Sequence, residues 1–113
     1  MKATKNTLYR IEDYINGKLI ETDGTLNKTE FTLLTLTEEE SKEIVSILEN
    51  NIPNYGHRCI SVYRDGIIVD DLVYNICLSC GDFYKGNEHF YLSKEGIDKF
   101  NNFKKEILNN NRV

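Results

Sequence analysis

The chain has 113 residues, of which 40% are hydrophobic and 28% charged, and its formal net charge is −4. This composition is typical of one globular domain over residues 1–113, and the apolar runs are too short to span a membrane. The negative charge disfavours binding to nucleic acid or to an anionic membrane and favours a protein partner with a basic surface. No apolar signal-peptide core follows Met1-Lys2, which indicates a cytoplasmic chain or one that is already processed, and the odd number of cysteines favours a reducing compartment, so we expect a cytoplasmic location.

The first third of the chain predicts three strands. Residues 8–15 and 18–22 flank Asn16-Gly17, the dipeptide that best fits a two-residue turn, so they predict a hairpin. Residues 31–36, rich in threonine and apolar side chains, predict the third strand.

A helix is predicted to begin after Thr37. Thr37 and Glu40 have the spacing of a capping box, and residues 38–40 place three glutamates at the positive end of the helix dipole. Pro53 marks the end of the helix. Apolar residues recur at helical spacing and predict a buried stripe of Ile44, Ile47, Leu48 and Ile52.

The second half of the chain alternates strand and turn patterns. Residues 59–64 and 67–69 flank Asp65-Gly66, which predicts another hairpin. Residues 72–80 form the longest strand-like run, with one apolar and one mixed face. Residues 82–84 and 89–92 predict two short strands joined through residues 85–87. Ser93 then caps a last helix with an apolar stripe of Ile97, Phe100, Phe103, Ile107 and Leu108.

The predicted order is therefore β-β-β-α-β-β-β-α. Hairpin turns between neighbouring strands indicate an antiparallel sheet of about five to seven strands, and the helices, each apolar on one side, are expected on a single sheet face. The sequence thus predicts a single-domain α+β fold whose other sheet face is free to meet a partner.

The spacing of two cysteines suggests a thiol site. Cys77 and Cys80 are followed by Gly81, which allows the tight turn that brings two thiolates onto one metal ion. Cys59 and one histidine, His57 or His89, can complete a four-ligand zinc site. The alternatives are a redox pair, for which no following helix lowers a thiol pKa, and thiols without a ligand.

Acidic and aromatic side chains gather in the second half. The pair Asp70-Asp71 is expected at a sheet edge or in a bulge, with a metal-binding carboxylate pair as the alternative. His57 and His89 are the only side chains whose ordinary pKa is near neutral, and packing is the default role of each. Tyrosines beside acids are typical of protein interfaces, so the candidate partner-binding residues are Asp70, Asp71, Tyr74, Asp82 and Tyr84.

Several short motifs carry a resemblance. They are Tyr63 in a strand, the turn at Asp65-Gly66, residues 76–80, and residues 92–96 before an amphipathic helix. In these motifs the second half resembles a group of small uncharacterised bacterial proteins with an apolar strand that ends in Cys-x-x-Cys. No activity comes with the resemblance, which implies a fold rather than a function.

Together these patterns predict a small acidic protein that acts by binding rather than catalysis and needs no cofactor. No nucleophile elbow, phosphate-binding glycine loop or two-histidine protease motif is found in the sequence. We expect an inhibitor that occupies a partner's surface, as immunity proteins that neutralise toxins and phage-encoded inhibitors do. A zinc or thiol-redox domain centred on Cys77 and Cys80 is the alternative, and the oligomeric state is left open.

Overall fold

The computed structural model describes residues 2–12, 15, 17–52 and 62–109. These residues contain two helices and seven strands. In chain order they are β1 (Thr7–Arg10), β2 (Thr32–Thr35), α1 (Glu38–Glu49), β3 (Asn51–Ile52), β4 (Asp65–Val69), β5 (Leu72–Ile76), β6 (Asp82–Lys85), β7 (Glu88–Leu92) and α2 (Lys94–Asn109). Neither helix in these ranges is long and apolar enough to cross a bilayer.

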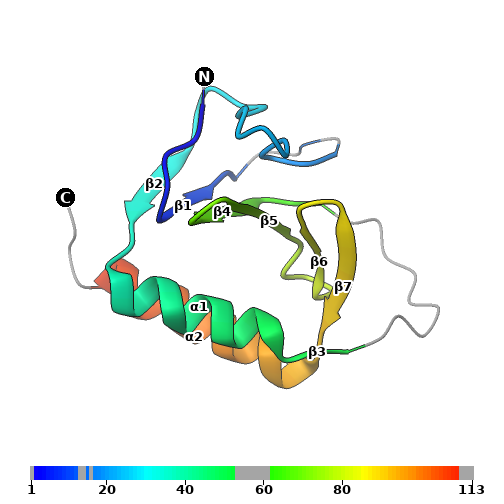
Figure 1. Cartoon of the computed structure of the whole chain (residues 1–113). Coiled ribbons are helices and arrows are strands. Elements are labelled where there is room, and N and C mark those ends of the chain that lie inside the picture. Colours follow the sequence, from blue (N-terminus) through cyan, green and yellow to red (C-terminus); the bar gives the residue numbers. More distant parts are fainter. Residues whose placement is uncertain (1, 13–14, 16, 53–61, 110–113) are drawn as a thin grey trace.

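The strands form one open antiparallel sheet with the order β2-β1-β4-β5-β6-β7-β3. Figure 1 shows both helices lying side by side against one face of this sheet. The prediction of an α+β fold with an antiparallel sheet of five to seven strands and two helices on one face is confirmed. The core on the helix face includes Leu8, Ile44, Ile67, Tyr74, Ile76, Phe83, Phe100 and Phe103.

Both helices begin where their caps predict. The Thr37 hydroxyl accepts the Glu40 N–H at 3.1 Å and the Glu40 carboxylate accepts the Thr37 N–H at 2.8 Å, which completes the capping box. The Ser93 hydroxyl accepts the Gly96 N–H at 3.1 Å. The predicted stripe of the first helix is one residue too long, because α1 ends at Glu49 and Ile52 lies in β3, where it is 38% exposed.

The predicted hairpin around Asn16-Gly17 is wrong in its pairing. β1 pairs with β2 on one side and with β4 on the other, so residues 18–22 do not form its neighbouring strand. These residues instead place Leu19 and Ile20, both fully buried, against the sheet face opposite the helices. Burial of two consecutive apolar side chains outweighed the local turn preference. Asn16 itself lies outside the described residues.

The segment around Ile20 covers the second sheet face over β1, β4 and β5. It packs with Tyr9, Ile68 and Val73, so this part of the face is not free for a partner as the sequence predicted. Asn75, on the mixed face of β5, holds the segment through both of its amide atoms. Its Oδ1 accepts the Ile20 N–H at 2.9 Å and its Nδ2 donates to the Ile20 carbonyl at 2.8 Å.

Replacing Asn75 with alanine is expected to lower the free energy of unfolding by roughly 2 kcal/mol, because it leaves the buried N–H and C=O of Ile20 without partners. Urea unfolding of both proteins measures the difference. A loss under roughly 0.5 kcal/mol, the scale of ordinary surface substitutions, would contradict this role of the Asn75 amide.

The predicted turn at Asp65-Gly66 is also wrong, since both residues lie inside β4. The chain turns instead at Asp70-Asp71, where Val69 pairs with Leu72 across a two-residue connection. Two tertiary contacts keep Asp65 and Gly66 in the strand. Asp65 is buried and lies 3.1 Å from Lys104 Nζ of α2, and a Cβ at Gly66 would lie 2.6 Å from Ile20 Cδ1. The predicted strand of residues 59–64 is wrong for residues 62–64, which precede β4 and lie in no strand, and residues 59–61 lie outside the described residues.

Candidate functional site

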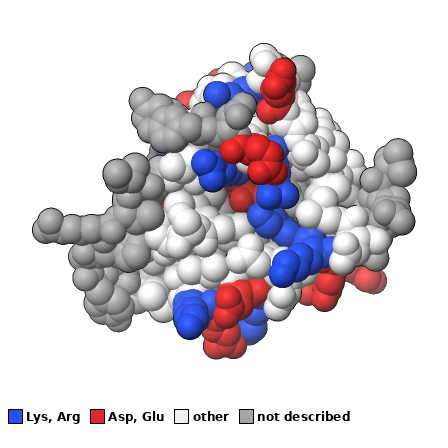
Figure 2. Space-filling model, turned by 180° about the vertical axis from the view of Figure 1, so that it is seen from behind, with Lys and Arg blue, Asp and Glu red and all other residues white. Residues whose placement is uncertain are grey.

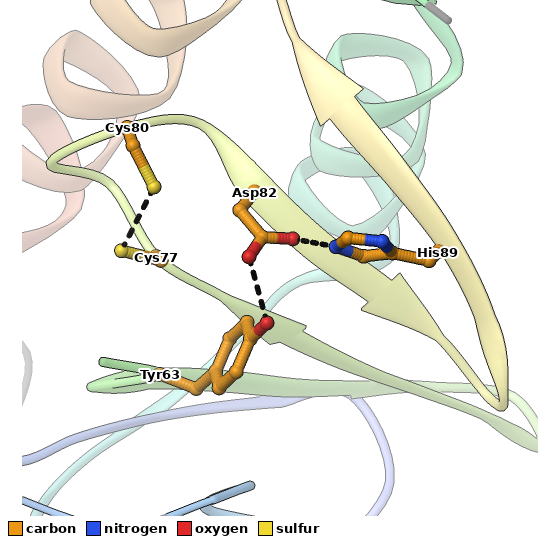
Figure 3. Close-up of polar contacts among 5 residues, drawn as sticks. All are labelled: Tyr63, Cys77, Cys80, Asp82 and His89. Atoms are coloured by element: carbon orange, nitrogen blue, oxygen red, sulfur yellow. Dashed lines mark hydrogen bonds and ion pairs between the residues drawn. The ribbon is translucent and has the colours of Figure 1, made fainter. Parts of the chain in front are cut away.

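The predicted strand of residues 72–80 ends early and leaves its two cysteines in a turn. β5 stops at Ile76, and Cys77 to Gly81 connect it to β6. The Cys77 N–H donates to the Asp82 carbonyl and the Gly81 N–H donates to the Cys77 carbonyl, both at 2.7 Å. This turn brings the sulfurs of Cys77 and Cys80 within 3.4 Å of each other (Figure 3).

The surroundings of Cys77 favour its thiolate. Burial on its own raises the pKa of Cys77, but hydrogen bonds from the Ser79 hydroxyl, the Val62 N–H and the Cys80 thiol outweigh burial and lower that pKa below its ordinary value. The sequence places no helix N-terminus after Cys80 that would lower a thiol pKa. Direct hydrogen bonds lower the pKa of Cys77 instead. Cys77 is 1% exposed, whereas Cys80 is only partly buried.

The predicted zinc site falls only partly within the described residues. Cys77 and Cys80 lie together, while Cys59 and His57 lie outside the ranges that the structure describes. Within those ranges no group of three or more histidine, cysteine, aspartate or glutamate residues lies close enough to hold a metal ion. A zinc site of Cys77, Cys80, Cys59 and His57 therefore stays a prediction.

A second polar cluster lies beside the turn, on the sheet face away from the helices. The buried carboxylate of Asp82 accepts a hydrogen bond from the Tyr63 hydroxyl at 2.8 Å, and its other oxygen contacts Nε2 of His89 (Figure 3). The ring of Tyr84 stacks on His89 at 4.6 Å and that of Tyr91 lies 4.9 Å away. These contacts compensate a buried carboxylate and fix the orientation of the imidazole.

Sequence reasoning treated Asp82 and His89 separately. The register of the β6–β7 hairpin pairs Tyr84 with His89 and Asp82 with Tyr91, which places Asp82 and His89 diagonally on one face. The alternation of side chains along the two predicted strands could have predicted this contact. Residues 82, 84, 89 and 91 share one face of the sheet when the two strands are joined by Gly86-Asn87.

The candidate partner-binding residues are not brought together. Tyr74 is 2% exposed under the helices and Asp82 is 4% exposed in the cluster just described, so neither side chain is presented at the surface. Tyr84 is half-buried beside His89. Asp70 and Asp71 are exposed in the β4–β5 turn, where Asp71 pairs with Lys5 at 3.2 Å.

Asp70 belongs to a groove that the sequence did not predict. This groove, called here the acidic groove, has a volume of about 450 Å³ and lies between α1 and the β4–β5 turn. Val45 and Val69 supply apolar lining. Three carboxylate residues and one lysine supply the charges, and they are Glu38, Glu49, Asp70 and Lys42. His89 is not part of its lining.

Two residues of the acidic groove have an unusual backbone. Asn6 and Asp70 both have φ of 55°, and they are the only non-glycine residues with positive φ among those described. Both line the groove. Asparagine and aspartate adopt this left-handed backbone more readily than other non-glycine residues, and both residues lie in turns, Asp70 in the two-residue connection of β4 and β5.

Ser41 adds a buried polar atom to the same lining. The residue is 5% exposed, and its Oγ is the one buried side-chain oxygen or nitrogen that has no hydrogen-bond partner in the described part of the chain. Because buried polar groups are nearly always paired, an unpaired hydroxyl in the lining of the groove is unusual. Neither its burial nor its lack of a partner is visible in the sequence.

Comparison with protein-family models, with curated proteins and with solved structures found no match to this chain. The resemblance of its second half to small bacterial proteins stays a prediction.

Proposed function

We propose that this chain is a small acidic binding protein that acts without catalysis and holds a basic segment of a partner protein in the acidic groove. Such proteins are found among toxin-neutralising immunity proteins and phage-encoded inhibitors. The observation that carries the proposal is that Glu38, Glu49 and Asp70 line one groove together with Val45 and Val69.

The lining of the groove suits a lysine or arginine side chain. Such a side chain has an apolar stem and a cationic head, and Val45 and Val69 can pack against the stem while the carboxylates attract the head. The volume of about 450 Å³ lies within the range of roughly 300–1,000 Å³ that is usual for ligand pockets.

Charge also favours this occupant. The groove holds three carboxylate residues against one lysine, and Lys42 is already 3.7 Å from Glu38. On the face shown in Figure 2, by contrast, acidic and basic side chains alternate in a band without a field of one sign. Attraction of a basic partner is therefore expected to arise locally at the groove and to weaken as salt increases.

Selection of peptides from a random-sequence display library tests the proposal. Peptides that bind are expected to carry lysine or arginine beside an aliphatic residue. The double variant Glu38→Gln/Asp70→Asn should bind the strongest peptide roughly tenfold more weakly, since each lost charge-assisted contact costs about 0.5–1 kcal/mol. Calorimetry at increasing salt measures the affinities.

The matched control is Glu39→Gln/Glu43→Gln, which removes the same charge from α1 at exposed positions outside the groove lining. It should bind within about twofold of the unchanged protein at moderate salt, because Glu39 and Glu43 do not line the groove and a charge that does not contact the peptide is screened by salt. Equal losses in both double variants, peptides without basic residues, or free spermidine binding as tightly as the peptide would each contradict the proposal.

A further inference from the structure

The turn between β5 and β6 holds two thiols in unequal positions. Cys80 is partly buried and reachable from solvent, whereas Cys77 is 1% exposed beneath it. Their sulfurs are 3.4 Å apart, so they need to approach by about 1.4 Å to reach the disulfide bond length of about 2.05 Å. The two thiols are thus adjacent but not bonded to each other.

The backbone of the turn holds this arrangement in place. Gly81 has φ of 84°, and its carbonyl accepts the Leu92 N–H at 2.8 Å from the end of β7. The bonds between Cys77 and Asp82 and between Gly81 and Cys77 close the base of the turn. Ser79 at its tip is exposed, so the tip is the part with room to adjust when the sulfurs approach.

We propose that Cys77 and Cys80 form a reversible dithiol–disulfide switch, in which Cys80 reacts first with a small disulfide and Cys77 then resolves it. The switch is independent of the acidic groove, which lies at α1 and the β4–β5 turn. Exposure sets the order of the two steps, because an oxidant from solvent meets Cys80 and not Cys77.

With glutathione disulfide as the oxidant, each step is a thiol–disulfide exchange. The Cys80 thiolate attacks one sulfur of glutathione disulfide, whose S–S bond breaks, and the first glutathione leaves as a thiolate and takes up a proton. The Cys77 thiolate then attacks Sγ of Cys80, the mixed disulfide breaks, and the second glutathione leaves. Two protein thiols are oxidised and one disulfide is reduced to two glutathione molecules.

The hydrogen bonds at Cys77 suit the second step. The Ser79 hydroxyl, 3.1 Å from the sulfur, and the Val62 N–H stabilise the thiolate that has to attack. A buried thiol without such partners stays protonated and inert. Ser79→Ala is therefore expected to slow closure of the internal disulfide and to leave the first step unchanged.

The test uses the full chain with Cys59→Ser, so that only this pair can react, and follows exposure to glutathione disulfide by mass spectrometry. The parent should form an internal disulfide, seen as the loss of two hydrogens, with little mixed disulfide. Adding Cys77→Ser should trap glutathione on Cys80. Adding Cys80→Ser should slow the reaction by at least roughly tenfold, because the remaining thiol is buried.

Three results would overturn the switch. One is an equal reaction rate for the two single-cysteine proteins, which would remove the assigned order. Another is a mixed disulfide that persists in the parent. The third is stoichiometric zinc in the purified wild-type chain that blocks oxidation and is lost on changing both cysteines, which would make the pair a metal site. If Cys77→Ser unfolds, as circular dichroism will show, Cys77→Ala replaces it.

Discussion

Replacing Lys104 with alanine is expected to lower the free energy of unfolding by roughly 3–5 kcal/mol, the usual cost of breaking a buried ion pair. Lys104 Nζ lies 3.1 Å from Asp65 Oδ1, and the side chains are only 11% and 6% exposed. The variant leaves the Asp65 carboxylate buried between the sheet and α2 without this cation. Urea unfolding at neutral pH measures the loss.

Two controls separate this effect from simple truncation. Lys99→Ala breaks the pair with Glu95 on the same helix, but those side chains are 52% and 78% exposed, so it should cost less than about 0.5 kcal/mol. The double variant Lys104→Met/Asp65→Leu removes both charges and should recover most of the stability. A single-variant loss as small as that of Lys99→Ala would contradict the role of the pair.

The pH dependence of stability gives an independent readout of Asp65. Burial raises the pKa of Asp65 above its ordinary value of 3.8, and Lys104 only partly opposes that rise. The native state therefore keeps a proton that the unfolded chain has released, and stability falls as pH rises from 3.8 through the native pKa. Lys104→Met should steepen this fall and extend it to higher pH, and adding Asp65→Asn should abolish it.

Replacing Gly81 with alanine is expected to lower the free energy of unfolding by roughly 2–5 kcal/mol, because backbone strain and overpacking add. Gly81 has φ of 84°, and a Cβ there would lie 2.8 Å from the Leu92 carbonyl oxygen and 2.9 Å from Ile97 Cδ1. The carbonyl belongs to β7 and cannot move without breaking its place in the sheet. Urea unfolding of the reduced protein measures this loss.

Gly86→Ala is the matched control for backbone strain alone. Gly86 also has positive φ, 59°, but nothing lies within 4 Å of the position that a Cβ would take. It should therefore cost only roughly 1–2 kcal/mol. Equal losses for the two alanine variants would show that the turn at Gly81 is not held against β7 and α2.

Local patterns predicted the elements whose causes are local. Thr37 with Glu40, and Ser93 with Gly96, start the helices through bonds that span three residues, and such bonds are readable from spacing. The proximity of Cys77 and Cys80 could be predicted for the same reason. Two residues that are three positions apart at the end of a strand come together only if the chain turns there.

The sequence patterns did not predict features that depend on contacts between residues far apart in the chain. Asp65-Gly66 has the composition of a turn, but Lys104, 39 residues after Asp65, and Ile20, 46 residues before Gly66, keep both residues in β4. Asn75 lies on the mixed face of β5, and its partner there is the backbone of Ile20, 55 residues away in the sequence. The acidic groove joins Asn6, Glu38 and Asp70 from three parts of the chain, and no local pattern connects them.

The most direct test of the binding function is to follow backbone amide chemical shifts by nuclear magnetic resonance while the strongest selected basic peptide is added. The account predicts that the largest shifts fall on Ser41, Val45 and Asp70, in the lining of the acidic groove, and that they shrink in Glu38→Gln/Asp70→Asn. Shifts that gather instead on the β6–β7 hairpin, with the amides of Ser41 and Asp70 unchanged, would contradict it.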